Sequence, residues 1–238
     1  MEPGDLLNSR PVRLAVNGTG TEVVKTHLSV ALLHALTLRG RSAVGLKPVE
    51  SGVGEGESDT SKLASAGTFH VKHSAPYRFP DPVSPHLAAR RAGVAIDTAQ
   101  IVAWVSASAA PWTVVETAGG LLSPLAVGVT NLDLLNLLSP DAVLLVGVDR
   151  LGVLHDVAAC VLALSVRAPT LPRAVVVLQP PESADSSTGT NADELVTLAI
   201  VPDAIAFPRG EAAALATVPA MLRLLEQLQS RLSAGRFT

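Results

Sequence analysis

A glycine- and threonine-rich segment near the amino terminus has the residue types of a phosphate-binding loop. It reads Gly18-Thr19-Gly20-Thr21-Glu22-Val23-Val24-Lys25-Thr26 and nearly fits the pattern G-x-x-x-x-G-K-[ST]. In such a loop, backbone N–H groups point at phosphate oxygens, the lysine neutralises the β- and γ-phosphates, and the following hydroxyl binds Mg²⁺. The segment therefore indicates a nucleotide site in which Lys25 and Thr26 carry the chemistry.

The segment departs from the pattern at Val24, where glycine is expected. Glycine leaves room for close approach of a phosphate, whereas the β-branched side chain of valine is stiff and resists unusual backbone angles. The loop alone leaves two interpretations open. It is either a nucleotide site or a Gly/Thr turn that caps a helix and leaves Lys25 in solvent.

Alternating strand and helix patterns must position this loop. Strands are predicted at Val12–Val16, Ser42–Leu46, Trp112–Val115, Ala142–Val148, Ala174–Leu178 and Ala204–Phe207. Helices are predicted at Lys25–Leu38, Thr60–Ala66, Leu87–Gly93, Asp97–Ala107, Asn131–Leu138, Leu154–Leu164, Asp193–Ala199 and Thr217–Leu232. Two segments are predicted to be irregular, the proline-rich Tyr77–Pro85 and the glycine-rich turn Thr117–Gly120.

This alternation predicts an α/β fold with a parallel sheet flanked by helices. We expect a single domain over residues 11–238, after a loose tail at 1–10. Ligands of such folds bind at the carboxyl ends of the strands. The segments expected along that edge are 17–26, 47–52, 116–120 and 149–152.

The composition narrows the class of protein. The chain has 238 residues, of which 48% are hydrophobic and 16% charged, with a net charge of −3. So apolar a chain is not intrinsically disordered, and its charge argues against nucleic-acid binding. The apolar runs Ala142–Val148 and Val157–Val166 are too short to span a membrane, so we expect a cytoplasmic protein with no membrane partner. Cys160 is the only cysteine, which excludes an intrachain disulfide.

Four further segments carry a family resemblance. They are Lys47-Pro48-Val49-Glu50-Ser51-Gly52, Ser58-Asp59-Thr60, the stretch from Tyr77 to His86 with its Pro82-Val83-Ser84-Pro85-His86 ending, and Glu116-Thr117-Ala118-Gly119-Gly120. In this order after the loop, they resemble dethiobiotin synthetase, from about Val12 to about Asp156. The resemblance implies a homodimeric P-loop NTPase-like protein that uses ATP, Mg²⁺ and CO₂. Its reaction closes the ureido ring of 7,8-diaminopelargonate through a carbamate and a carbamic-phosphoric anhydride.

The resemblance also implies roles for individual residues. The catalytic residues would be Lys25, Lys47 and Ser51, because two lysines can neutralise a carbamate and a triphosphate together. The Mg²⁺ ligands would be Thr26, Asp59 and Glu116. Nucleotide contacts would come from Gly18, Gly20, Thr21, Glu22, Val23, Val24, Lys25, Thr26, Gln179 and Pro208. Substrate contacts would come from Thr21, Lys47, Ser51, Gly119, Gly152 and His155, the last two from across the dimer interface.

Several positions differ from the family pattern. Thr117 replaces the glycine that normally follows the metal-binding glutamate, Gln179 replaces an adenine-reading asparagine, and His155 replaces another asparagine. Gln179 keeps an amide that could pair with adenine. The alternative to an active enzyme is a catalytically impaired homologue of the same fold that acts as a binding or regulatory protein.

Overall fold

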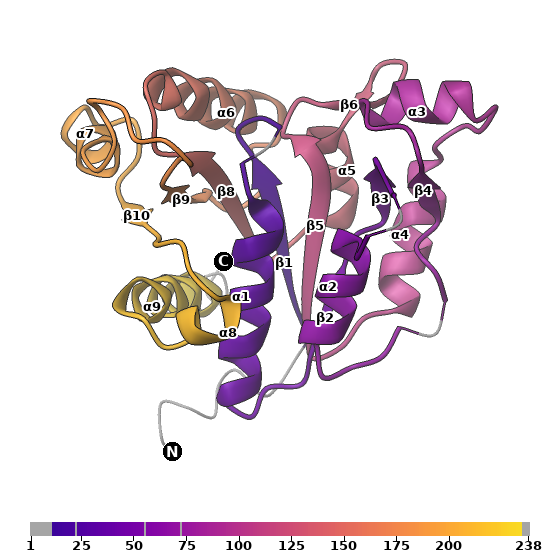
Figure 1. Cartoon of the computed structure of the whole chain (residues 1–238), viewed down its shortest axis with the longest axis horizontal. Coiled ribbons are helices and arrows are strands. Elements are labelled where there is room, and N and C mark those ends of the chain that lie inside the picture. Colours follow the sequence, from indigo (N-terminus) through magenta and orange to yellow (C-terminus); the bar gives the residue numbers. More distant parts are fainter. Residues whose placement is uncertain (1–10, 22, 55, 72, 235–238) are drawn as a thin grey trace.

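Strands and helices alternate along the chain in the computed structural model, which describes residues 11–21, 23–54, 56–71 and 73–234 (Figure 1). The expected tail at 1–10 and Glu22 lie outside the described residues. The strands are β1 (Val12–Gly18), β2 (Ala43–Leu46), β3 (Val49–Ser51), β4 (Tyr77–Phe79), β5 (Trp112–Gly120), β6 (Pro124–Ala126), β7 (Val129–Thr130), β8 (Ala142–Val148), β9 (Val175–Gln179) and β10 (Ala204–Ala206). The helices are α1 (Lys25–Leu38), α2 (Asp59–Ala66), α3 (Pro85–Arg91), α4 (Thr98–Ala107), α5 (Asn131–Leu138), α6 (Val153–Arg167), α7 (Asn191–Thr197), α8 (Ala212–Leu215) and α9 (Pro219–Ala234).

The main sheet of the described residues has six strands in the order β10-β9-β8-β1-β5-β2, and every neighbouring pair is parallel. The central strand, β1, lies between β5 and β8. The chain continues to one side of β1 through β2 and β5 and then to the other side through β8, β9 and β10. The carboxyl end of β1 is therefore the switch point at which ligands bind in open α/β sheets.

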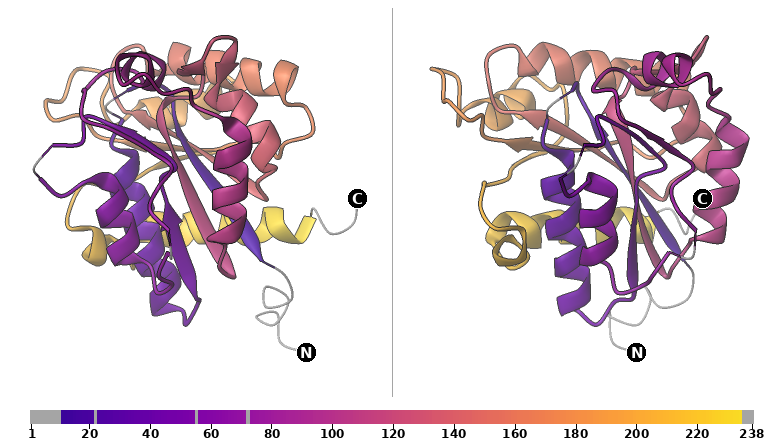
Figure 2. Two further views of the ribbon diagram at one scale, coloured as in Figure 1. Left: turned by 90° about the vertical axis from the view of Figure 1, so that its right-hand side faces the viewer. Right: turned by 45° about the vertical axis from the view of Figure 1, so that its right-hand side comes forward.

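Helices cover both faces of this sheet, as Figure 2 shows. Leu14 and Val16 of β1 pack in a cluster with residues of α1, α2, α8 and α9. Ala15 packs on the opposite face with residues of α5, α6 and α7. Because both faces of each strand are buried, the strands are almost continuously apolar, and the predicted fold class is confirmed.

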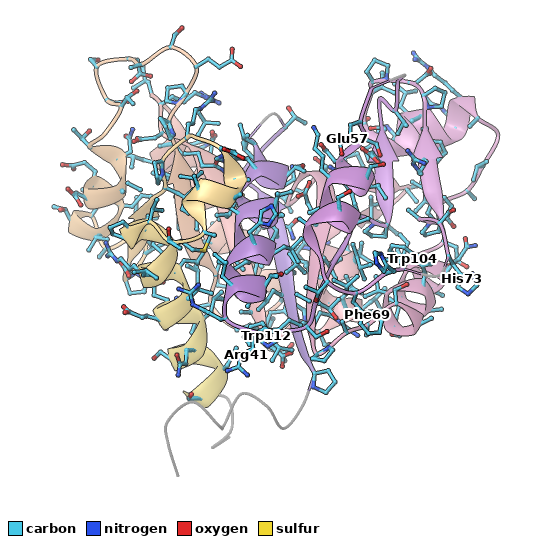
Figure 3. All side chains as sticks on the ribbon, turned by 60° about the horizontal axis from the view of Figure 1, so that its bottom comes forward. Arg41, Glu57, Phe69, His73, Trp104 and Trp112 are labelled. Carbon is cyan, nitrogen blue, oxygen red and sulfur yellow. The ribbon has the colours of Figure 1, made fainter. Side chains whose placement is uncertain are left out.

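The two ends of the sheet differ in chemistry. Trp112 begins β5 and lies with Arg41 at the amino end, while Glu57 precedes α2 towards the carboxyl end (Figure 3). The Trp112 backbone N–H donates to the Ser42 carbonyl at 3.0 Å, which ties β2 to β5 at the amino end. Within the described ranges, no helix combines the length and the apolar composition that crossing a bilayer requires.

Two predictions of irregular structure are wrong. Tyr77–Phe79 forms β4, which pairs in parallel with β3, and the prolines of that segment follow the strand without interrupting it. The strand that begins at Trp112 continues through Thr117–Gly120 instead of ending in a turn. Gly119 adopts φ +74°, and the register of β5 against β1 shifts there, so the glycines bend the strand without ending it.

Candidate active site

The phosphate-loop segment begins at the carboxyl end of β1 and folds tightly over the neighbouring strands. The Thr19 N–H donates to the Val146 carbonyl, and the Leu121 N–H donates to the Gly18 carbonyl, both at 2.8 Å. A Cβ atom at Gly18 would lie 2.6 Å from the Gly20 carbonyl oxygen, so only glycine fits this turn. The loop therefore wraps the switch point of the sheet.

Val24 adopts the left-handed backbone conformation, with φ 52° and ψ 38°, immediately before α1. The glycine of the phosphate-loop pattern adopts positive φ without steric cost, whereas an L-residue in this region costs about 1–2 kcal/mol. The loop thus takes the conformation that favours glycine in spite of the β-branched side chain. The strain expected from the sequence is present at this residue.

Lys25, Thr26, Lys47, Asp59 and Glu116 converge below the loop, and we call them the charged cluster. Lys47 Nζ donates to Asp59 Oδ2 at 2.5 Å and to Glu116 Oε1 at 2.8 Å. Thr26 Oγ1 donates to the same Glu116 oxygen at 2.7 Å. Lys25 is only 8% exposed, so the interpretation that leaves this lysine in solvent is wrong.

Burial and neighbouring charges set the protonation of the cluster. Burial lowers the pKa of Lys25 to about 8, although Glu116 opposes this effect. Burial also acts against the charged form of Lys47, but Glu116 and Asp59 outweigh it and raise the pKa of this lysine. The same ion pair, with Lys47, keeps the pKa of Asp59 below its ordinary value despite burial. Of Lys25, Lys47 and Asp59, Lys25 is therefore the one whose pKa lies closest to neutral pH.

Two residues that the sequence did not single out complete the network. Ser29 lies one turn after Lys25 on α1 and donates from Oγ to Glu116 Oε2 at 2.8 Å. Glu50 on β3 accepts from the Asp59 backbone N–H at 2.7 Å. The i, i+4 spacing of Lys25 and Ser29 was a signal available in the sequence. The contact between Glu50 and Asp59 depends on how β3 packs beside α2.

Gln179, expected to face adenine, is fully buried and bonded to the protein itself. Its Nε2 donates to the Val24 carbonyl at 3.0 Å, and its Oε1 lies 2.8 Å from His27 Nδ1. The other ring nitrogen of His27 lies 2.7 Å from the Gly210 carbonyl oxygen. We call His27 and Gln179 the clip, because together they join the phosphate loop, the end of β9 and the loop after β10.

Thr117 occupies the position where the family has glycine, and it is buried between β5 and β1. Its Oγ1 donates to Asn17 Oδ1 at 2.7 Å. Asn17 Nδ2 has no hydrogen-bond partner among the described residues, although the side chain is fully buried. Thr117 thus orients a polar side chain directly before the loop and does not project into the charged cluster.

The other predicted substrate residues lie on different elements. Ser51, four residues after Lys47 in the sequence, is the last residue of β3. It pairs with Phe79 of β4. Gly119 lies in the bend of β5, where an added Cβ would approach Ser123 Oγ to 2.6 Å and Thr21 Cγ2 to 3.8 Å. Its backbone is therefore close to the phosphate loop, as a substrate position there requires.

Three predicted contacts are exposed and lie away from the charged cluster. Gly152 and His155 are at the start of α6, and Pro208 is in the loop after β10. The loop that carries Pro208 is held by the clip and by Arg209, whose Nε donates to the Pro180 carbonyl at 2.7 Å. At the start of α6, Gly152 and His155 are exposed, whereas Val153 between them is buried.

Two cavities flank the phosphate loop, and Val23 and Val24 line both. The first, of about 490 Å³, is lined by the charged cluster together with His27, Val30, Lys62 and Ala212. The second, of about 770 Å³, extends from the loop backbone at Thr19–Thr21 to Arg150, Asp156, Val148, Pro181, Glu182 and Arg209. Together they offer room for an extended anionic ligand across the switch point.

The donors of the charged cluster suit a hard divalent cation. Mg²⁺ is bound in proteins through one or two carboxylates together with substrate phosphates and water. Lys47 donates to both Asp59 and Glu116, and the Thr26 hydroxyl donates to Glu116, so the single positive charge of Lys47 offsets only part of the charge of the two carboxylates. No group of three or more His, Cys, Asp or Glu residues that could hold a metal occurs among the described residues.

Comparison with known proteins identifies the family. A family model described as an AAA domain matches residues 12–224. The ATP-dependent dethiobiotin synthetase BioD of Anaeromyxobacter dehalogenans is 41% identical over 192 residues, which cover 78% of this chain and 84% of the relative. This chain belongs to the dethiobiotin synthetase family. The corresponding protein of Methylobacterium nodulans is 39% identical over 71% of this chain and 81% of its own length.

The solved structures similar to this member of the dethiobiotin synthetase family show its fold alone. A ParA family ATPase from Chlorobium tepidum has a TM-score of 0.52 and 13% identity, covering 94% of this chain and 96% of its own. The MinC:MinD cell division complex of Aquifex aeolicus has a TM-score of 0.50 and 12% identity, with the same coverage. Both comparisons agree with a P-loop arrangement around β1. The family match extends well beyond Asp156, where the sequence resemblance ended.

Proposed function

We propose that this protein is an ATP-dependent dethiobiotin synthetase that closes the ureido ring of 7,8-diaminopelargonate. The observation that carries this proposal is the pair of buried lysines below the phosphate loop, Lys25 and Lys47, with Glu116 beside them. A carbamate and a triphosphate are both anionic and repel each other. Two preorganised cations that line one cavity are the means to bring them together.

The reaction proceeds in steps that need charge stabilisation more than proton transfer. One amine of the substrate takes up CO₂ to give a carbamate and releases a proton. A carbamate oxygen then attacks the γ-phosphorus of ATP, and ADP leaves. The second amine attacks the carbonyl carbon of this mixed anhydride, phosphate leaves, the nitrogen loses a proton, and the ring closes. In this scheme, Lys25 stabilises the phosphates and Lys47 the carbamate, with Ser51 beside Lys47.

Mg²⁺ would neutralise part of the triphosphate charge when bound. The residues that would hold it are Thr26, Asp59 and Glu116. Both carboxylates accept from the Lys47 ammonium, and Glu116 also accepts from the Thr26 hydroxyl. The Lys47 ammonium has three N–H donors and uses two of them on carboxylates, so the third would serve the carbamate. A divalent cation beside those carboxylates would favour a shift of the ammonium towards the substrate.

The nucleotide would lie along the loop from Gly18 to Thr26, with Pro208 near the base. In this proposal Gly20 and Val23 would contribute backbone N–H groups to the phosphates, and Glu22 belongs to the same segment of the sequence. Because both ends of the Gln179 amide are used within the protein, we assign Gln179 to the support of the loop and not to the reading of adenine. The base would occupy the second cavity, on the far side of Val24.

A homodimer would bring the start of α6 to the substrate. Leu162 and Val166 of α6 and Leu137 of α5 are more than half exposed, which is unusual for such side chains on neighbouring helices. In a dimer through this face, Gly152 and His155 of one protomer could reach the substrate carboxylate in the other, next to Thr21 and Gly119. Because the reaction consumes ATP, the proposed location is the cytoplasm.

The direct test is turnover by the purified protein. Incubation with 7,8-diaminopelargonate, Mg-ATP and bicarbonate should yield dethiobiotin, ADP and phosphate in equal amounts, measured by mass spectrometry and phosphate release. A reaction without the diamine is the control for idle ATP hydrolysis. Absence of dethiobiotin at millimolar ATP, together with no calorimetric heat on adding Mg-ATP, would favour the catalytically impaired homologue.

A further inference from the structure

Glu50 is a buried carboxylate next to the charged cluster. It is 6% exposed, and its cationic neighbour, Arg78, has an exposed side chain whose Nε is 3.9 Å away. A buried carboxylate is costly unless hydrogen bonds and charge compensate it. The cost of burying the Glu50 charge must therefore be compensated mainly by interactions other than an ion pair.

The amino terminus of α2 supplies that compensation. Glu50 Oε1 accepts from the Asp59 N–H at 2.7 Å, and Oε2 accepts from the Thr60 hydroxyl at 2.5 Å and from the Thr60 N–H at 3.4 Å. The first N–H groups of a helix lack partners within the helix and favour an anion. Ser58 caps the same helix in the usual way, because its Oγ accepts from the Ser61 N–H at 3.1 Å.

The segment from Lys47 to Glu50 therefore holds Asp59 at two points. The Lys47 ammonium binds the side-chain carboxylate, and the Glu50 carboxylate binds the backbone N–H of the same residue. The two contacts differ in their relation to the proposed reaction. The Lys47 ammonium would be shared among Asp59, Glu116 and an anionic substrate, whereas nothing in that reaction competes for Glu50.

We infer that Glu50 is a positioning residue that keeps the Asp59 carboxylate directed at the metal and nucleotide while Lys47 also binds the substrate. This inference rests on the proposed function, since it takes Asp59 as a ligand of the divalent cation. Glu50 itself does not contact the reacting atoms. Its effect on the reaction passes entirely through the placement of Asp59 at the first turn of α2.

The test is metal binding by the full-length protein in the presence of a non-hydrolysable ATP analogue. Mn²⁺ replaces Mg²⁺ as the probe, and free Mn²⁺ is measured by electron paramagnetic resonance. Glu50→Ala should weaken Mn²⁺ binding at least fivefold while changing the affinity for the metal-free analogue less than twofold. Ser58→Ala, which removes a cap from the same helix but not from Asp59, should weaken Mn²⁺ binding less than twofold.

A loss smaller than fivefold in Glu50→Ala, or an equal loss in Ser58→Ala, overturns the positioning role. If Glu50→Ala does not yield folded protein by circular dichroism, Glu50→Gln takes its place, with a threefold loss as the threshold. If the unchanged protein binds no Mn²⁺ with the analogue, the metal site of the proposed function falls and this inference falls with it. If the unchanged protein binds Mn²⁺ and only the Glu50 result fails, the proposed function stands.

Discussion

Two groups of residues around the phosphate loop use their polar atoms in opposite ways. The charged cluster points its lysines and carboxylates into a cavity of about 490 Å³. The clip, whose His27 lines the same cavity, turns the polar ends of His27 and Gln179 onto Val24 and Gly210. The charged cluster, which we call the charged side, keeps every residue that the family resemblance assigns to it. The clip side, made of the clip and Val24, departs from the family at Val24 and Gln179.

This difference shows which residues of the site are constrained by the chemistry of the reaction. Charge stabilisation of a carbamate and a triphosphate needs particular ionised groups at particular places, so substitutions there remove the function. Holding a base needs mainly a cavity and a loop of the right shape, which several sets of residues can build. Changes at Lys47 should therefore alter turnover more than nucleotide affinity, whereas changes at Lys25, which faces the phosphates in this scheme, should alter nucleotide affinity as well. Changes on the clip side should alter mainly nucleotide affinity.

Lys47→Ala should have the largest effect. Turnover should fall by about 10³-fold, because the variant loses the cation that stabilises the carbamate, while the Kd of Mg-ATP changes less than about tenfold. Lys62→Ala is the matched control, since the Lys62 ammonium is 3.7 Å from Asp59 but 46% of its side chain is exposed. That variant should retain turnover within twofold. Equal loss of turnover and of ATP affinity in Lys47→Ala would contradict the assignment of Lys47 to the substrate side.

The second effect is the pH dependence caused by Lys25. Because its pKa is about 8, the lysine is increasingly neutral above pH 8, and the affinity for Mg-ATP should fall about tenfold per pH unit there. Calorimetry at pH 9 in buffers of different ionisation enthalpy should show uptake of close to one proton on binding. Lys25→Met should remove both effects.

The lowered pKa of Lys25 also predicts that the folded protein becomes more stable as the pH rises. Between pH 8 and 10.5 the unfolded chain keeps the proton that folded Lys25 has lost. The free energy of unfolding should therefore gain about 3 kcal/mol from this group as the pH rises through that range. Urea denaturation of the unchanged protein and of Lys25→Met across the range measures the difference. If the free energy of unfolding of the unchanged protein, relative to that of Lys25→Met, falls as the pH rises, then burial does not disfavour the charged form of Lys25.

A smaller effect is expected on the clip side. His27→Ala removes the contacts to Gln179 and Gly210, which should raise the Kd of Mg-ATP by about tenfold through loss of loop order. Turnover at saturating nucleotide should stay within twofold. His34→Ala, about 10 Å further along the same helix, is the control. A fall in saturated turnover as large as that of Lys47→Ala would abolish the distinction between the two sides.

The smallest effect is expected at Val24. Val24→Gly should stabilise the protein by about 1 kcal/mol, because it removes the steric cost of φ 52° but adds backbone freedom to the unfolded chain. The Kd of Mg-ATP should tighten severalfold as the side chain no longer crowds the loop. Val24→Ala keeps the Cβ atom and should recover less of both. An unchanged Kd in Val24→Gly would mean that the bound loop already accommodates valine.

The local sequence pattern was sufficient to predict an element where the residues of that element define it. The bounds of Lys25–Leu38, Asn131–Leu138 and Ala142–Val148 were predicted as the structure has them, because apolar periodicity and end signals lie within each segment. It was insufficient for β4, a short strand next to prolines that exists by pairing with β3. It also missed that the glycines of β5 bend a strand that remains paired with β1.

The sequence by itself determined the chemical groups of this protein and their order: a phosphate loop with Lys25, a second lysine, and the carboxylates that resemble those of a dethiobiotin synthetase. Only the tertiary structure decided which of these side chains can contact a ligand and in which protonation state. It buried Lys25 and so lowered its pKa, bonded Gln179 to the loop, and brought Glu50 under α2 to hold Asp59. The physical reason is that burial, and contacts between residues distant in sequence, depend on packing and have no local signature in the chain.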